Sequence, residues 1–329
     1  RFSQGTGLNH PISSMASHSV TSLSAGIYCI DANYIRPRLA CSYLSVHQGK
    51  AAFIDCGTSY STPHLLSALV DIGLTAEDVE YIIPTHVHLD HAGGAGRLMQ
   101  ACPNAVLLAH PRGLRHLINP QRLVESARSV YGADKFDALY GDILPVEEQR
   151  TQAAEDQSEF SLNGRTLYFA DTPGHARHHF CVYDEISRGW FTGDTFGLSY
   201  PDLTIRSGQY IMPTTTPTQF EPDAWQATLD KLLENQPLRM YLTHYGMIEN
   251  TGRYAAKLRS DLQSYCDLAS RLKEQNDREQ SLEDTLMTFT LKDLKNSGCT
   301  LSDPEIKYLI SDDIKLNAQG LDIWLSRSA

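Results

Sequence analysis

Short apolar runs separated by turn-forming residues occupy the first part of the chain and predict β-strands. These runs lie at residues 26–30, 39–46 and 51–57. A helix is expected directly after them, because Ser61 or Thr62 can cap its N-terminus and Pro63 suits its first turn. The amino-terminal region therefore predicts a sheet with a helix packed against it.

The alternation of strands and helices continues to about residue 250. Further strands are predicted at residues 79–86, 105–110 and 239–244, and helices at 95–102 and 221–235. Residues 159–171 form a predicted hairpin around Asn163 and Gly164, a pair that suits a tight two-residue turn, and another strand pair turns around Gly189. Such alternation is typical of sheets covered by helices, so the fold class is a layered α/β body.

Two long stretches depart from this alternation. Residues 111–150 are helical in pattern and polar on one side, which predicts an inserted helical cap. Residues 253–329 are mostly helical, with a polar join near residues 273–280, and predict a C-terminal helical extension. Residues 1–14 are polar and unpatterned, and we interpret them as a tail or an expression remnant. The predicted catalytic body is residues 15–252.

Composition narrows the function classes. The formal net charge of −11 argues against a nucleic-acid binder, which needs a basic face. No apolar run approaches the roughly 18 residues of a membrane span, and no stretch near the start has the pattern of a signal peptide. Seven scattered Cys without a C-x-x-C pair predict reduced thiols and a cytoplasmic protein. We expect a small-molecule substrate and no nucleic-acid or membrane partner, and we leave a homodimer open.

The segment "PTHVHLDHAGG", residues 84–94, concentrates metal-binding chemistry. Neutral imidazoles and carboxylates suit Zn²⁺ and related ions, and alternate residues of an extended segment point to one side. His86, His88 and Asp90 are therefore expected on one side of a strand end, with His91 at the following turn. A merely His-rich loop is disfavoured, because 13 His in 329 residues rarely place three within six positions. The cluster holds too many ligands for one ion and too few for two.

Three further candidates share one setting, an apolar strand followed by a small residue or Thr. They are His175 in "DTPGHA", Asp194 in "FTGDTF" and His244 in "YLTHYG". Taken singly, a His near a strand end is usually a surface residue, and an Asp after Gly usually forms a turn. Taken with the His cluster, the three predict the missing ligands of a metal site.

The motifs "HVHLDH", "PGH", "TGD" and "LTH", in this order, resemble the metallo-β-lactamase superfamily from about residue 25 to 250. The resemblance implies an αββα sandwich with two metal ions at one edge between the sheets. By the same resemblance, the first ion is held by His86, His88 and His175, the second by Asp90, His91 and His244, and Asp194 bridges them. Asp55, in "FIDCG", matches a strand-end Asp that supports the ligand loop.

A narrower resemblance concerns the helical insert, the "GHARHH" run and the "MPTTTP" segment. Together they resemble a branch of hydrolases that are called glyoxalase II-like. Residues 253–329 show no glutathione-binding pattern that we recognise, so the resemblance does not fix a thioester substrate.

The implied ligands point to a hydrolase. Two divalent ions, most simply Zn with Mn or Fe as alternatives, can share one hydroxide that attacks an ester, thioester or lactone carbonyl. Asp90 would orient that hydroxide and later carry its proton, which makes it the expected catalytic residue. The alternatives are a phosphodiesterase of the same superfamily, an iron-dependent persulfide dioxygenase and a binding protein without activity.

Candidates for a substrate pocket come from sequence position. Tyr200 and Tyr245 lie near Asp194 and His244 and could donate to an oxyanion, although packing of their rings in the core is the simpler interpretation. The segment 197–217 lacks a clear pattern, and long irregular segments are often functional. On that ground its side chains are expected to line the pocket, in particular Arg206, Tyr210 and Met212.

Overall fold

The computed structural model describes residues 20–215 and 217–327, so the expected tail at residues 1–14 lies outside the described residues. Within these ranges most strands belong to two sheets. The first sheet has the order of the chain, β1 (Val20–Ser22), β2 (Ile27–Asp31), β3 (Cys41–His47), β4 (Lys50–Ile54), β5 (Val79–Ile83), β6 (Val106–Ala109) and β7 (Thr151–Ala153). The second runs β15 (Gly246–Ile248), β14 (Arg239–Leu242), β11 (Gly189–Gly193), β10 (Phe180–Asp184), β9 (Arg165–Asp171) and β8 (Glu159–Leu162).

The two sheets face each other across a buried apolar layer. Ile54 and Ile83 from the first sheet pack in one cluster with Phe169, Phe191 and Tyr241 from the second. The exposed fraction of each of these side chains is at most 1%. This layer fixes the relative position of the strand ends that carry the candidate ligands.

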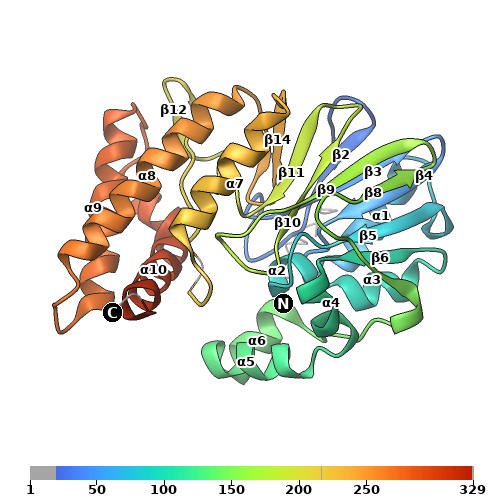
Figure 1. The fold of residues 1–329 in the computed structure, drawn as a ribbon, viewed down its shortest axis with the longest axis horizontal. Coiled ribbons are helices and arrows are strands. Elements are labelled where there is room, and N and C mark those ends of the chain that lie inside the picture. Colours follow the sequence, from blue (N-terminus) through green and yellow to red (C-terminus); the bar gives the residue numbers. More distant parts are fainter. Residues whose placement is uncertain (1–19, 216, 328–329) are drawn as a thin grey trace, which may run out of the picture.

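Helices cover the outer faces of both sheets (Figure 1). On the first sheet, α1 (Thr62–Asp71) and α3 (Ala95–Ala101) bury their apolar faces in a second cluster with the strands. On the other sheet, α7 (Pro222–Glu234) contributes the buried Trp225 and Leu229 to a third cluster. The helix–sheet–sheet–helix order confirms the predicted αββα sandwich.

The region of the predicted helical insert, residues 111–150, contains three helices. Its helices are α4 (Pro111–Ile118), α5 (Gln121–Tyr131) and α6 (Ala133–Tyr140), which lie together at the bottom of Figure 1. After residue 140 the chain runs through a short 3₁₀ turn, η2 (Glu148–Arg150), into β7, which pairs in parallel with β6. The strand β7 was not predicted, because a three-residue edge strand carries too little periodicity.

The C-terminal helices share a core with the second sheet. They are α8 (Thr251–Arg271), α9 (Arg278–Asn296) and α10 (Asp303–Arg327), and Figure 1 shows them beside α7. Leu258 of α8, Leu286 of α9 and Ile310 of α10 belong to the same apolar cluster as Trp190 of β11. No helix of the described residues is long and apolar enough to cross a membrane.

The remaining elements are one predicted turn, a 3₁₀ turn and a small two-stranded ribbon. The hairpin of β8 and β9 turns at Asn163 and Gly164, whose φ angles are +46° and +97°, as the sequence predicted. Another 3₁₀ turn, η1 (Ala76–Asp78), precedes β5, and a small ribbon of β12 (Thr204–Ile205) and β13 (Gly208–Gln209) interrupts the irregular segment before α7.

Candidate metal centre

The seven candidate ligands lie in segments that follow strand ends at one edge of the sandwich. His86 and His88 follow β5, whereas Asp90 and His91 lie in the short helix α2 (Leu89–Ala92). The prediction that His86, His88 and Asp90 share one side of an extended strand end was therefore wrong at Asp90, which is helical. The chain becomes helical at Leu89, so Asp90 and His91 belong to a helical turn and not to an extended segment.

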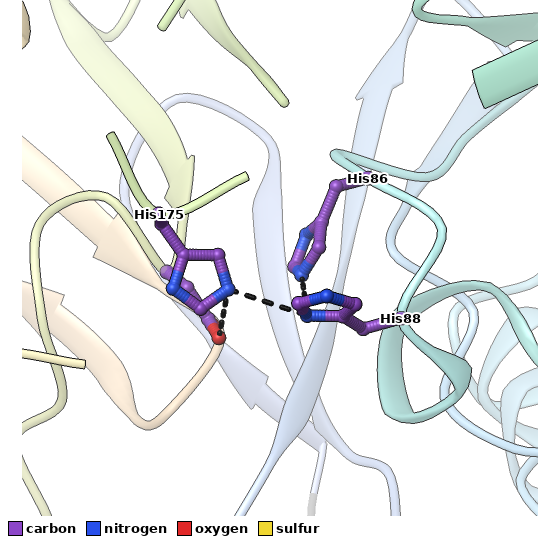
Figure 2. Close-up of side chains that lie close together, drawn as sticks. His86, His88 and His175 are labelled. Carbon is purple, nitrogen blue, oxygen red and sulfur yellow. Dashed lines mark hydrogen bonds and ion pairs between the residues drawn. The ribbon is translucent and has the colours of Figure 1, made fainter. Parts of the chain in front are cut away.

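The first ligand group contains His86, His88, His175 and Asp194, whose ligand atoms lie within 4.8 Å of one another. The Nε2 atom of His86 is 2.8 Å from Nδ1 of His88, and Nε2 of His175 is 3.3 Å from the same atom. Figure 2 shows the ring of His175 meeting the other two rings from the opposite side. His175 follows β9 in the second sheet, so this group joins loops of both sheets.

The second group contains Asp90, His91 and His244. The Nε2 atom of His244 lies 3.1 Å from Oδ2 of Asp90, and Nε2 of His91 lies 3.6 Å from that oxygen. Asp194 stands between the groups, because its Oδ2 is 3.2 Å from Nε2 of His175 and its Oδ1 is 3.1 Å from Nε2 of His91. One carboxylate thus faces both groups, the arrangement that a bridging ligand requires.

Burial determines the protonation of the first group. Desolvation, followed by the effect of neighbouring imidazoles, lowers the pKa of His86 and His88 well below the usual value. The pKa of His175 is lowered as well, mainly by burial. These imidazoles are neutral near pH 7, which is the form that binds a metal ion.

The second group has the opposite electrostatics. Burial alone would lower the pKa of His91, but the carboxylates of Asp194, Asp55 and Asp90 outweigh it and raise the pKa well above the usual value. The pKa of His244 is raised to about 9 against the effect of burial, mainly by Asp194 and Asp90. Without a metal ion these imidazoles hold protons in place of a cation, so metal binding must release them.

Asp55 ties the ligand loops together. Its side chain is fully buried, and its Oδ1 accepts hydrogen bonds from the N–H of Thr85 (2.7 Å) and the hydroxyl of Thr85 (2.9 Å). Its Oδ2 accepts from Nδ1 of His91 (2.7 Å) and from the hydroxyl of Thr243 (2.6 Å). Since Thr85 precedes His86 and Thr243 precedes His244, this carboxylate at the end of β4 joins the two ligand loops that follow β5 and β14.

The other ligand rings are oriented by backbone carbonyl groups. His175 donates from Nδ1 to the carbonyl oxygen of Thr214 (2.9 Å), and His244 donates from Nδ1 to that of Leu39 (2.8 Å). A ring that donates from Nδ1 presents Nε2 to the centre. The buried His179 accepts the N–H of Asp194 at its Nε2 (3.3 Å) and so supports the bridging carboxylate from behind.

Two buried atoms between the ligand groups indicate whether these residues fit metal ions. Nε2 of His91 and Oδ1 of Asp194 lie 3.1 Å apart, yet neither atom makes a hydrogen bond within the described part of the chain. The two atoms form an ion pair without hydrogen-bond geometry, and a cation that both atoms face would compensate for the missing hydrogen bonds. With seven nitrogen and oxygen donors around them, the residues fit two divalent ions.

The side chains of three expected pocket residues are held by the C-terminal helices. Tyr200 is buried and donates its hydroxyl to Asp313 of α10, and Tyr210 donates to Asp293 of α9 (2.8 Å). Met212 is fully buried in the apolar core beneath the C-terminal helices. These three contacts belong to the interface with the C-terminal extension, so their side chains are not available to a substrate.

Two other pocket candidates are also engaged elsewhere. The side chain of Arg206 covers Gly298 between α9 and α10, where even an added Cβ would lie 2.5 Å from its Cγ. Tyr245 is partly buried and packs against the apolar clusters on both faces of the second sheet. Sequence position alone placed these residues near the site, but their side chains point to other partners.

Thr85 and Thr243 were missed in the sequence. The signal was present, because both "PTH" and "LTH" place a Thr directly before a candidate His, and each Thr hydroxyl donates to the same carboxylate. Thr214 had no such signal, since it acts mainly through its carbonyl oxygen.

Comparisons with known proteins agree with this geometry. A family model described as the metallo-beta-lactamase superfamily matches residues 36–244. A metallo-beta-lactamase fold-containing protein of Sulfurisphaera tokodaii is 27% identical over 228 residues, which cover 68% of this chain and 79% of that protein.

Solved structures share the fold. The crystal structure of an archaeal metallo-beta-lactamase superfamily protein from Sulfolobus tokodaii is 23% identical, with a TM-score of 0.64 over 93% of this chain and 100% of its own. A metallo-beta-lactamase family protein of Thermus thermophilus is 18% identical, with a TM-score of 0.66 over 93% of this chain and 95% of its own. At these identities the structural likeness establishes the fold alone.

Proposed function

The chain belongs to the metallo-β-lactamase superfamily, and we propose that it is a two-metal hydrolase of an ester, thioester or lactone. Members of this superfamily are generally metal-dependent hydrolases. Family membership supports hydrolysis as the reaction, and the hydrolysis, the carbonyl substrate and the pair of ions are all parts of the proposal.

One observation carries the two-metal part. The two oxygens of Asp194 face different ligand groups, Oδ2 toward His175 and Oδ1 toward His91 and His244. His86, His88 and His175 would hold one ion, with Asp90, His91 and His244 around the other and Asp194 between them. When bound, two such ions supply Lewis acids for a carbonyl oxygen and lower the pKa of water towards about 7.

The chain also supplies an open side and a base. Of the seven ligands only His88 and Asp90 are partly exposed, so a substrate reaches the centre from their side. The side chain of Asp90 is 21% exposed, and the imidazoles of His91 and His244 help to hold its pKa well below the usual range against the effect of burial. As an ionised group at the open side, Asp90 is placed to orient the attacking water and to receive its proton.

A substrate panel tests this proposal. The purified protein, loaded with Zn or Mn, is assayed with an acyl thioester, a lactone, an aryl ester and bis(p-nitrophenyl) phosphate. We expect turnover of at least one carbonyl substrate, loss of that turnover on chelation, and its return when the metal is added back. Asp194→Ala should abolish it.

Other outcomes would select the alternatives. Turnover of the phosphate diester alone would replace the proposal by a phosphodiesterase. A single iron per chain with oxygen consumption on a persulfide substrate would replace it by the dioxygenase. Unchanged hydrolysis by metal-free protein would contradict the two-metal mechanism itself.

A further inference from the structure

Asn317 of α10 holds an irregular segment of the main body. The side chain is 2% exposed, its Oδ1 accepts the N–H of Thr215 (2.6 Å), and its Nδ2 donates to the carbonyl oxygen of Pro213 (3.0 Å). The backbone carbonyl of Asn317 accepts the hydroxyl of Thr215 (2.9 Å). Residues 213–215 are therefore fixed by a residue more than one hundred positions away.

The residue between these contacts, Thr214, touches two candidate ligands. Its carbonyl oxygen accepts Nδ1 of His175 (2.9 Å), and its hydroxyl donates to the carbonyl oxygen of Asp194 (2.8 Å). Because Pro213 and Thr215 are held on either side, the direction of the Thr214 carbonyl depends on Asn317. That carbonyl sets both the ring orientation of His175 and the nitrogen that carries its proton.

A second contact comes from the same face of α10. Asp313, one turn before Asn317, accepts the hydroxyl of Tyr200 at both carboxylate oxygens (3.1 and 3.0 Å). The neighbouring Ser199 donates its N–H to the carbonyl oxygen of His244 (2.5 Å). The same helix face thus supports segments that reach both ligand groups.

We propose that Asn317 is a positioning residue for the ion bound by the first ligand group, an inference that rests on the proposed two-metal function. Packing alone does not require an amide here. A buried Asn within a helix is unfavourable unless its polar atoms are satisfied, and an apolar side chain would serve as well to join α10 to the body. The polar atoms of Asn317 are satisfied by the segment that orients His175, so the C-terminal extension forms part of the metal centre.

Metal affinity tests this role without any substrate. In Asn317→Leu, which removes the polar atoms, and in Asn317→Ala, the affinity of each ion is measured by competition with a chromophoric chelator. The visible spectrum of the Co²⁺-substituted protein reports the geometry of the ligands. We expect one of the two ions to bind about 10- to 100-fold more weakly, with an altered Co²⁺ spectrum, while the other changes by less than about 3-fold.

Two matched controls lie on the same helix. Gln319→Ala removes another amide, whose Nε2 donates to Glu279 of α9 (3.1 Å) and not to the main body. Ile310→Ala removes buried apolar contacts of α10 and lowers the Tm, but it leaves the polar atoms of Asn317 in place. Both controls should keep both metal affinities and the Co²⁺ spectrum of the wild type.

A double-mutant cycle identifies the path. Thr214→Val removes the hydroxyl that donates to Asp194, so it disturbs the same segment from its other end. If Asn317 acts through this segment, the loss of affinity in the double variant is smaller than the product of the two single losses.

The outcomes separate this inference from the proposed function. If Asn317→Leu and Asn317→Ala lower the Tm but keep both affinities and the spectrum, Asn317 only joins α10 to the body and the inference is wrong. If the two substitutions weaken metal binding independently, so that their losses multiply in the double variant, Asn317 does not act through Thr214. If the wild type binds no divalent ion, the two-metal function itself fails, which the variants cannot mimic.

Discussion

Asp55→Asn replaces one carboxylate oxygen by an amide nitrogen at the point where the ligand loops after β5 and β14 meet. A carboxylate only accepts hydrogen bonds, so Nδ1 of His91 must donate to it, and Nε2 is then free to bind a metal ion. An amide nitrogen in the same place donates to Nδ1 instead. The ring proton then moves to Nε2, and His91 in that form cannot be a ligand.

The size of the effect follows from the bonds at this residue. Hydrogen bonds to a charged group contribute about 1.5–3 kcal/mol and neutral ones about 0.5–1.5 kcal/mol. The bonds from Thr85, His91 and Thr243 all weaken when the charge is removed. We expect the free energy of unfolding of the metal-free protein to fall by about 2–4 kcal/mol and the affinity for one ion to fall about 10- to 100-fold.

Two assays separate these effects. Urea unfolding of the metal-free protein measures stability, and competition with a chromophoric chelator measures metal affinity. Asp184→Asn is the matched control, because Asp184 is equally buried and charged but binds Arg165, away from the centre. This control should lose stability and keep its metal affinity. Wild-type affinity in Asp55→Asn would refute the assignment of Asp55 as the residue that orients His91.

Three further predictions concern the stability of the fold. In Gly174→Ala the new Cβ would lie 2.5 Å from backbone and side-chain atoms of Trp225, at a φ of +128°, so urea unfolding should show a loss of about 2–5 kcal/mol; wild-type stability would contradict this. Burial raises the pKa of Asp261 to about 6 against the opposing effect of Lys257, so the folded state keeps a proton that the unfolded state releases. The free energy of unfolding of the metal-free protein should therefore fall by about 2 kcal/mol as the pH rises from 4 to 6, relative to that of Asp261→Asn, in urea titrations. If the wild type and Asp261→Asn show parallel pH profiles, this prediction is wrong. A chain ending at residue 250 exposes the apolar face under α8–α10 and should aggregate on expression; a soluble fragment with a cooperative thermal transition would show that the body folds alone.

The sequence predicted most of the fold because the long strands and helices carry local signals. Each of these signals lies within a short run of neighbouring residues. This holds for the apolar strands before α1, for the Asn163–Gly164 turn and for the motifs with the candidate ligands. The short edge strands β7 and β15 were not predicted, because three residues do not show a period. The helical turn at Asp90 was also missed, since "HVHLDH" has the alternation of an extended segment.

The surroundings of the centre could not be derived in the same way. Tyr200 was predicted to line a pocket because it is close in sequence to Asp194, and Tyr210 because the segment 197–217 lacks a regular pattern. Their hydroxyl partners, Asp313 and Asp293, lie more than eighty residues later and mark the interface with the C-terminal helices. Asn317 has no sequence signal, because a polar residue within a long helix usually faces solvent. The glyoxalase II-like assignment and the division into a body and an extension stay predictions.

The central claim is that this chain binds two divalent ions with one carboxylate between them. Equilibrium dialysis against Zn²⁺, followed by elemental analysis, measures the number of ions per chain directly. We predict two ions per wild-type chain and fewer in Asp194→Ala, which removes the residue that faces both ligand groups. Wild-type protein that binds fewer than two ions, or Asp194→Ala protein that binds as many ions as the wild type with equal affinity, would contradict this claim.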